Sequence, residues 1–241
     1  MTLPKGVDHI HFETIDSTNL EARRRVRDCH APIWITADEQ TAGLGRRGRA
    51  WSTVSGNFAG SYLMPVTKPV QHQALYSFVA ALGLYDACAD VTGRAEAFTL
   101  KWPNDVLMNG AKIAGILLEA IGAPSHLVVG IGVNLRHDAE AGKLAEDAHP
   151  TASLGSDLDA RGFLEVLSPH FQQYAARFQT EGFGPIRDAW LDRAAKRGEV
   201  ITARLPNQEV TGVFRDVDNT GAMILENAEG RHTIAAGDVF F

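Results

Sequence analysis

The sequence is poor in cysteine, since only Cys29 and Cys88 occur among its 241 residues. They lie in separate segments and form no C-x-x-C pair. A disulfide framework or a zinc knuckle needs more cysteines at closer spacing, so neither is expected. So few cysteines fit a reducing compartment, and we expect a cytoplasmic protein.

Long hydrophobic runs and an excess of positive charge are also lacking. Residues 1–8 hold no apolar signal region, and the apolar stretch at 75–89 is interrupted by Ser77 and Asp86 and is too short to span a bilayer. The formal net charge is −6, which argues against non-specific binding to nucleic acid. With 45% hydrophobic and 22% charged residues, the composition is that of a globular protein with an ample core.

Hydrophobic periodicity predicts an α+β fold. Asn109-Gly110 between two apolar runs favours a type I′ hairpin, and Thr18 with Glu21 has the spacing of a helix capping box. Strands joined by hairpins, with helices inserted between them, imply a mostly antiparallel sheet backed by helices. Strands are expected at about 9–15, 32–37, 58–64, 98–102, 106–108, 111–119 and 127–135, and helices at 18–29, 71–91, 161–179 and 185–196.

The pattern changes after Gly198 to short alternating runs separated by turn residues. Such closely spaced strands suggest a small β-barrel appended to the main body. We therefore predict two domains, residues 1–196 and residues 197–241. The five short strands are expected at 200–203, 210–214, 222–225, 232–234 and 239–241.

The segment 43–51 reads Gly-Leu-Gly-Arg-Arg-Gly-Arg-Ala-Trp. Its glycines let backbone N–H groups crowd around an anion, and its arginines supply positive charge and planar donors. The glycines match G-x-G-x-x-G, but that dinucleotide fingerprint needs a helix to open inside the motif, and residues 49–57 are turn-rich. The segment favours a flexible cationic loop that closes over a nucleotide and a second anion. A solvated basic turn is the plainer alternative.

Three further segments accompany this loop in a fixed order: Asp16–Asn19 before it, then Lys101–Asp105 with Lys112, then Gly130–Asn134. Together they resemble the biotin–protein ligases over essentially the whole chain. The resemblance implies a catalytic biotin ligase domain similar to class II aminoacyl-tRNA synthetases, followed by an SH3-like C-terminal barrel. It also implies ATP-dependent formation of biotinyl-5′-AMP, then transfer of biotin to a lysine of a biotin carboxyl carrier domain.

In that reaction a carboxylate attacks the α-phosphorus of ATP, so positive groups are needed where two anions meet. The resemblance implies that Arg46 and Lys112 line this junction. Asp105 is expected either to orient Lys112 or to hold Mg²⁺ through the phosphates, and an ordinary Asn-Asp turn is the alternative. Lys101 is interpreted as a structural residue of its strand.

The biotin ureido ring is neutral, with two donors and one acceptor, so its recognition requires hydroxyls, amides and backbone groups. Ser17, Thr18, Asn19 and Gln40 have this chemistry, although Ser17 and Thr18 are equally suited to capping a helix. The family's further biotin contacts come from Arg46, Lys112 and the backbone of Leu44 and Gly45. Leu44 stands where the family usually has arginine, and the backbone contact is expected to tolerate this.

On the nucleotide side, the resemblance implies Arg49, Trp51, Asn104 and Asn134. Glycines that only ease sheet packing are a comparable explanation of the segment before Asn134. Mg²⁺ is expected to bind through the ATP phosphates and not in a cage of protein ligands. His9 and His11 share a strand face without a third ligand nearby in the sequence, so no metal site is expected there.

Two other functions compete with this prediction. One is a lipoate or octanoate ligase of the same fold, whose Arg-Arg…Gly-Gly-Gly…His-Asp loop is absent here. The other is a non-catalytic binding module. The predicted partner is a biotin carboxyl carrier domain, with a homodimer left open. Contact with a membrane is not expected. Binding to DNA is not expected either, because about fifteen residues before Asp16 are too few for a helix-turn-helix domain.

Overall fold

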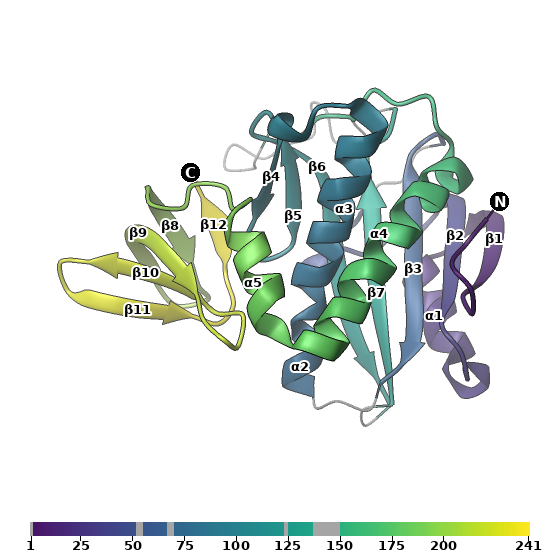
Figure 1. Cartoon of the computed structure of the whole chain (residues 1–241), viewed down its shortest axis with the longest axis horizontal. Helices are drawn as coiled ribbons and strands as arrows, with labels where there is room; N and C mark the ends of the chain where they lie inside the picture. Colours follow the sequence, from purple (N-terminus) through teal and green to yellow (C-terminus); the bar gives the residue numbers. More distant parts are fainter. Residues whose placement is uncertain (1, 52–54, 67–69, 123–124, 137–149) are drawn as a thin grey trace.

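The computed structural model describes residues 2–51, 55–66, 70–122, 125–136 and 150–241, and its strands form two separate sheets (Figure 1). The larger sheet has seven strands in the order β1-β2-β3-β7-β6-β5-β4. Its strands are β1 (Asp8–Ile15), β2 (Ile33–Gln40), β3 (Phe58–Pro65), β4 (Phe98–Lys101), β5 (Asp105–Met108), β6 (Ala111–Ile121) and β7 (His126–Val133).

The larger sheet is mostly antiparallel, as predicted. Only β1 and β2 pair in parallel among the described strands, because the chain between them passes through helix α1 (Thr18–Arg25) and the short turn η1 (Val26–Asp28). The predicted hairpin joins β5 and β6, and Asn109 and Gly110 both have positive φ, at 50° and 81°. Positive φ at both central positions is the signature of a type I′ turn.

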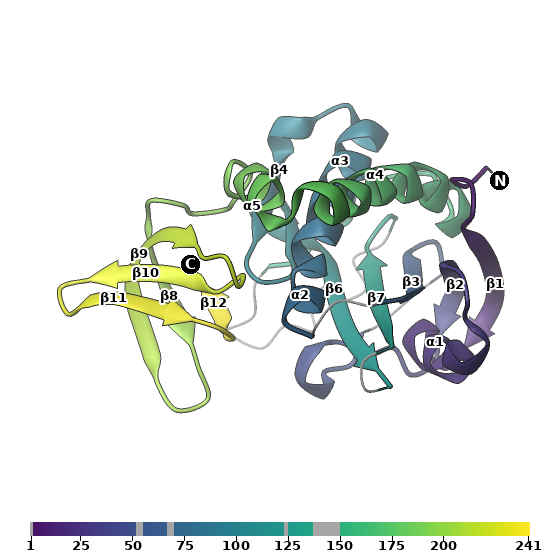
Figure 2. The same ribbon diagram turned by 60° about the horizontal axis from the view of Figure 1, so that its bottom comes forward.

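Helices cover the larger sheet on both faces (Figure 2). On one face lie α3 (Tyr76–Thr92), α4 (Ala160–Glu181) and α5 (Phe183–Leu191), and α1 lies against the other. Two aromatic side chains of the sheet, Trp34 and Tyr62, meet Phe171 of α4 with ring centroids 4.9–5.7 Å apart. The remaining short elements are α2 (Val70–Ala74), η2 (Arg46–Gly48) and η3 (Ala95–Ala97).

Helix α3 belongs to the apolar stretch that the sequence analysis judged too short for a bilayer, and that judgement is wrong. Within the described residues, one helical stretch, His72–Thr92, is long and apolar enough to cross a membrane by length and composition. Inside the protein most of its apolar window is buried, because the helix packs between the sheet and the neighbouring helices. Its apolar surface is therefore that of a core helix.

The C-terminal strands form an antiparallel sheet in the order β11-β10-β9-β8-β12, consistent with the SH3-like expectation. Arg187 of α5 anchors this sheet to the larger body through contacts of 2.6 Å to both carboxylate oxygens of Asp216. Trp102 adds a second anchor by donating to the carbonyl of Gly221 over 3.0 Å. The strands are β8 (Val200–Arg204), β9 (Glu209–Val217), β10 (Met223–Asn227), β11 (Gly230–Ile234) and β12 (Asp238–Phe240).

The N-terminus of α1 differs from the prediction. Ser17 is the N-cap, its side chain makes no capping hydrogen bond, and the α-helix ends at Arg25. The Glu21 carboxylate pairs with Arg24 at 3.1 Å and Arg25 at 2.7 Å instead of reaching back to the helix start. The predicted capping box is therefore wrong, because neighbouring arginines one turn away compete for the same carboxylate.

Candidate active site

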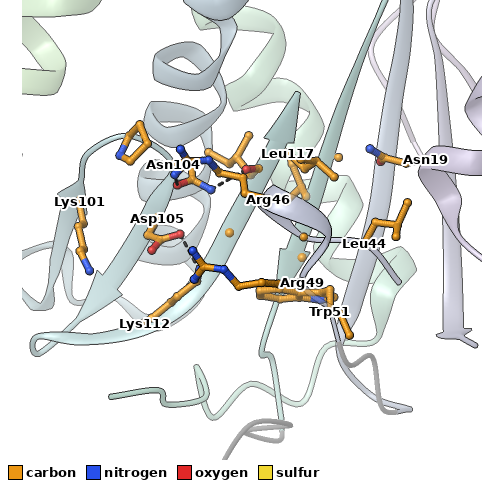
Figure 3. A pocket seen from close by; sticks show the side chains of 18 of the residues that line it. Asn19, Leu44, Arg46, Arg49, Trp51, Lys101, Asn104, Asp105, Lys112 and Leu117 are labelled. Carbon is orange, nitrogen blue, oxygen red and sulfur yellow. Dashed lines mark hydrogen bonds and ion pairs between the residues drawn. The ribbon is translucent and has the colours of Figure 1, made fainter. Parts of the chain in front are cut away.

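A cavity of about 370 Å³ opens beside the start of α1 (Figure 3). Residues of both sheets line it. Segments that are far apart in the sequence meet in it, including the arginine loop 43–51 and the C-terminal strand β12. Every predicted site residue lines this cavity: Ser17, Thr18, Asn19, Gln40, Leu44, Gly45, Arg46, Arg49, Trp51, Asn104, Asp105, Lys112 and Asn134.

Buried neutral polar groups form one end of the cavity, where α1 begins. Thr18 donates to Gln40 Oε1 through its backbone N–H at 2.8 Å and its hydroxyl at 3.1 Å. Ser61 Oγ lies 2.8 Å from Thr18 Oγ1 and 2.5 Å from Asn19 Oδ1. Asn19 in turn donates to Glu119 over 2.7 Å. These contacts fix the polar side chains in place, so this end suits a neutral ligand with several donors and acceptors.

Cations gather at the middle of the cavity. Lys112 Nζ lies 2.7 Å from Asp105 Oδ1, although the buried Oδ1 accepts no well-formed hydrogen bond, so the contact is an ion pair. This geometry favours Asp105 as the group that orients Lys112. Arg46 donates to Asn104 Oδ1 over 3.1 Å, and Asn104 donates to the carbonyl of Ile116 over 2.8 Å. Burial lowers the pKa of Arg46, and Asp238 opposes that effect.

The arginine loop folds back on itself without an α-helix, which agrees with rejecting the dinucleotide fingerprint. Gly45 donates to the carbonyl of Arg49 over 2.7 Å, and Trp51 donates to that of Gly43 over 2.9 Å. Between them lies the short turn η2, within which Arg47 has a φ of 56°. Leu44 lines the cavity and is 38% exposed.

The Trp51 side chain lies flat on strands β6 and β7, in space that two glycines leave open. A Cβ atom at Gly132 would overlap the Trp51 indole, and one at Gly115 would approach it to 3.2 Å. Lys112 Nζ lies 5.6 Å from the centre of the Trp51 ring. Gly132 of β7 therefore makes room for a side chain of the site, which is more than the easier sheet packing considered from the sequence. Asn134 at the end of β7 donates to the carbonyl of Ala152 over 3.1 Å.

Sequence reasoning missed two charged residues of the cavity. Lys101 lies in the strand predicted at 98–102 and is the last residue of β4, but it lines the cavity and is only 8% exposed. Asp238 comes from the C-terminal sheet and lies 2.8 Å from Arg47 and 2.6 Å from Arg49. Nothing in the sequence near Asp238 signals this contact, because it depends on how the second sheet packs against the first.

The paired histidines of β1 contact a hydroxyl and a carboxylate. His9 Nε2 lies 2.8 Å and His11 Nδ1 3.0 Å from Thr36 Oγ1, and His11 Nε2 lies 3.2 Å from Asp38. Burial, with smaller effects of His11 and Arg161, lowers the pKa of His9 to about 4. Within the described ranges, no group of three or more His, Cys, Asp or Glu residues is arranged to hold a metal ion.

Known protein families and relatives match this chain over most of its length. The profile described as "Biotin/lipoate A/B protein ligase family" matches residues 11–134, and that of "Biotin protein ligase C terminal domain" matches residues 198–241. The chain is 45% identical over 233 residues to the biotin–[acetyl-CoA-carboxylase] ligase of Paracoccus denitrificans, covering 94% of this chain and 97% of the relative. It is 34% identical over 213 residues to the enzyme of the same name from Mycobacterium tuberculosis, covering 86% and 78%.

Among solved structures, the fold is similar to that of the Aquifex aeolicus biotin protein ligase in complex with biotin and ATP. The TM-score is 0.79 at 25% identity, and the match covers 96% of this chain and 97% of that one. The profile matches include every predicted site residue and the strand that carries Asp238. The chain therefore belongs to the biotin/lipoate A/B protein ligase family, in agreement with its cavity and its two sheets.

Proposed function

We propose that this chain is an ATP-dependent biotin–protein ligase that forms biotinyl-5′-AMP and then transfers biotin to a lysine of a biotin carboxyl carrier domain. The main support for the proposal is the order in which neutral polar groups and cations line one cavity. A neutral polar end adjoins a cationic centre, as a ligand with a ureido ring and a carboxylate requires. The curated relatives named as biotin–[acetyl-CoA-carboxylase] ligases support the same assignment.

Biotin would bind with its ureido ring at the start of α1. Ser17, Thr18, Asn19 and Gln40 supply hydroxyl and amide groups there, and the backbone of Leu44 and Gly45 closes the wall. The Ser17 hydroxyl is not used as a helix cap, which leaves it available to the ligand. Asn19 is held by Ser61 and Glu119, so its amide is oriented before biotin arrives.

Adenylation would take place between Arg46 and Lys112. A biotin carboxylate oxygen attacks the α-phosphorus, the bond to the bridging oxygen breaks, and its electron pair leaves with pyrophosphate. Arg46 and Lys112 offset the negative charge that spreads in the transition state, and Asp105 holds Lys112 in position. The arrangement requires no proton transfer, because the attacking carboxylate is already ionised.

The nucleotide would bind across Trp51, with Arg49 at its phosphates and Asn104 and Asn134 as polar contacts. Mg²⁺ would be held by the ATP phosphates, where it neutralises charge on the leaving group. The neighbouring carboxylates fit this arrangement because each is already paired with a cation, Asp105 with Lys112 and Asp238 with Arg47 and Arg49.

In the second step, the amine of the carrier lysine would attack the acyl carbon of biotinyl-5′-AMP. An amide forms, the acyl–phosphate bond breaks, AMP leaves, and the amine proton passes to solvent.

We propose that the enzyme is cytoplasmic. We also propose that it has two domains, residues 1–196 and 197–241, and the separate sheets and the two profile matches support this division. A homodimer is compatible with this function and is left to measurement.

Biotin-dependent exchange of pyrophosphate into ATP, without any carrier protein, tests the first step. We expect exchange with biotin and not with lipoate or octanoate, and streptavidin-detectable labelling once a carrier domain is added. Exchange stimulated by lipoate or octanoate alone would favour the competing ligase of the same family. A chain that shows no exchange with any of the three acids would be a binding module.

A further inference from the structure

Lys101 places a buried positive charge at the far side of the cavity. It is the last residue of β4, and its side chain lines the cavity while only 8% of the residue is exposed. In the part of the chain that the structure describes, no carboxylate lies within 4.0 Å of Lys101 Nζ. Lys101 Nζ lies over the ring of Phe241, 5.3 Å from the ring centre. Burying an ammonium group without an anionic partner is costly.

The carboxylates of Asp105 and Asp238, which also line the cavity, form ion pairs with other cations. Asp105 lies 2.7 Å from Lys112, and Asp238 lies within 2.8 Å of both Arg47 and Arg49. Desolvation lowers the pKa of Lys101, and Asp105 opposes that effect from beyond ion-pair distance. The cavity lining thus holds four cations, Arg46, Arg49, Lys101 and Lys112, against the two carboxylates Asp105 and Asp238, and such an excess of positive charge is expected of a site that receives an anion.

The position of Lys101 identifies that anion. In Figure 3, Asn19 marks one end of the cavity, Lys101 lies at the other, and Arg46, Asp105 and Lys112 lie between them. In phosphoryl transfer the attacking and leaving oxygens lie roughly in line with the phosphorus. A carboxylate that arrives from the Asn19 end therefore expels pyrophosphate away from that end, toward Lys101.

We propose that Lys101 binds the β- and γ-phosphates of ATP and stabilises pyrophosphate as it leaves. The proposal rests on the proposed function and adds a residue that the sequence analysis took as structural. The bond from the α-phosphorus to the bridging oxygen breaks, and the charge that collects on pyrophosphate is met by the Lys101 ammonium. No proton is transferred. Phe241 faces the ammonium with its ring, a contact that favours the charged form.

Loss of the Lys101 charge should affect the two half-reactions differently, because pyrophosphate takes part only in the first. We expect Lys101→Met to raise the KM for pyrophosphate at least about tenfold and to slow adenylation by roughly 10². Its dissociation constant for biotin and its single-turnover transfer from preformed biotinyl-5′-AMP to a carrier domain should stay within about twofold of wild type. Lys101→Arg should recover part of the loss, since arginine also binds phosphate.

The matched control is Lys196→Met. Lys196 Nζ lies 5.9 Å from the same Phe241 ring, but its side chain is 40% exposed, pairs with Glu199 and lies outside the cavity lining. Its exchange kinetics should equal those of wild type. If Lys101→Met does not fold, Lys101→Gln provides the same comparison with a polar side chain.

Two outcomes would overturn the inference. One is a folded Lys101 variant with the wild-type KM for pyrophosphate, and the other is an equal loss in both half-reactions, which indicates a structural role. Both leave biotin-dependent exchange by the wild-type chain intact. Failure of the proposed function is recognised separately, because the wild-type chain itself would then show no such exchange.

Discussion

Lys112 and Asp105 form the one ion pair in the described structure that joins two predicted catalytic residues. A cation placed where carboxylate and α-phosphate meet acts mainly on the transition state. We therefore predict that Lys112→Ala lowers the exchange rate by about 10²–10³, with a smaller change in biotin affinity. Pyrophosphate exchange and equilibrium biotin binding, measured side by side, check this. A biotin affinity that falls as far as the rate would place Lys112 in ground-state binding instead.

His9 gives the protein a pH-dependent stability away from the cavity. Its pKa is about 4 in the folded chain against 6.5 as its ordinary value, so the unfolded chain binds more protons between these pH values. Stability should therefore fall as the pH drops from 6.5 to 4, with no further contribution from His9 below that. Urea unfolding of wild type and His9→Gln across this window tests the prediction.

The matched control for His9 is His30→Gln, which replaces an exposed histidine. The His9→Gln variant should show a shallower fall in stability than wild type, and His30→Gln should not. Because His9 is only half-buried, solvent screening keeps its contribution below the full value of the pKa shift. Parallel curves for His9→Gln and wild type would show that another group governs the acid range.

At the scale of single residues, the sequence could predict those site members whose neighbours carry a pattern. Arg46 and Arg49 stand among glycines, and Lys112 follows an Asn-Gly turn. Lys101 could not be recognised, because a lysine at a strand end resembles any edge charge until its burial is known. Asp238 could not be recognised either, since its partners lie almost two hundred residues away in the chain.

At the scale of elements, strand β7 and the arginine loop pack against each other where the Trp51 indole lies on Gly132. A methyl group there would overlap the Trp51 indole, so Gly132→Ala should push that ring off the sheet. We predict weaker ATP binding and stronger acrylamide quenching of tryptophan fluorescence. Quenching reports on Trp51 because the other three tryptophans are at most 4% exposed.

Gly184→Ala provides the control for Gly132, because a Cβ atom at Gly184 of α5 meets nothing within 4 Å. This variant should fold with unchanged quenching and gain slightly in helix stability. Unaltered quenching in Gly132→Ala would mean that the sheet shifts to accept the methyl group and leaves the indole in place.

Element types were predicted well because periodicity and turn residues are local signals. The Asn109-Gly110 hairpin is an example, since both residues adopt the backbone conformation that their sequence favours. The capping box failed because the helix start also depends on tertiary partners: Thr18 is held by Gln40 and Ser61, and Glu21 by arginines. Local pattern could not reveal those competing contacts.

For the whole molecule, Asp238 ties the C-terminal sheet to the arginine loop. Each exposed ion pair contributes about 0.2–1 kcal/mol, so loss of the pairs with Arg47 and Arg49 should weaken loop anchoring by about 1 kcal/mol. We predict that Asp238→Asn makes trypsin cleavage after Arg46–Arg49 roughly fivefold faster without ligand. Timed digestion followed by mass spectrometry checks this.

The control for Asp238 is Glu209→Gln, which breaks a pair with Arg204 at 2.6 Å within the same C-terminal sheet. Cleavage of the loop in this variant should match wild type, because the pair does not reach the cavity. Equal cleavage in Asp238→Asn and wild type would show that backbone contacts alone hold the loop.

The larger sheet is joined at its centre by β3 and β7, strands separated by sixty residues of sequence. Residues 8–65 carry the polar end of the cavity and the arginine loop, whereas residues 98–134 carry Lys101, Asp105, Lys112 and Asn134. A chain divided after Val66 would therefore yield two fragments that each hold half of the chemistry. Ligase activity would become a reporter of fragment reassembly, since neither piece alone could bring a carboxylate to a phosphate.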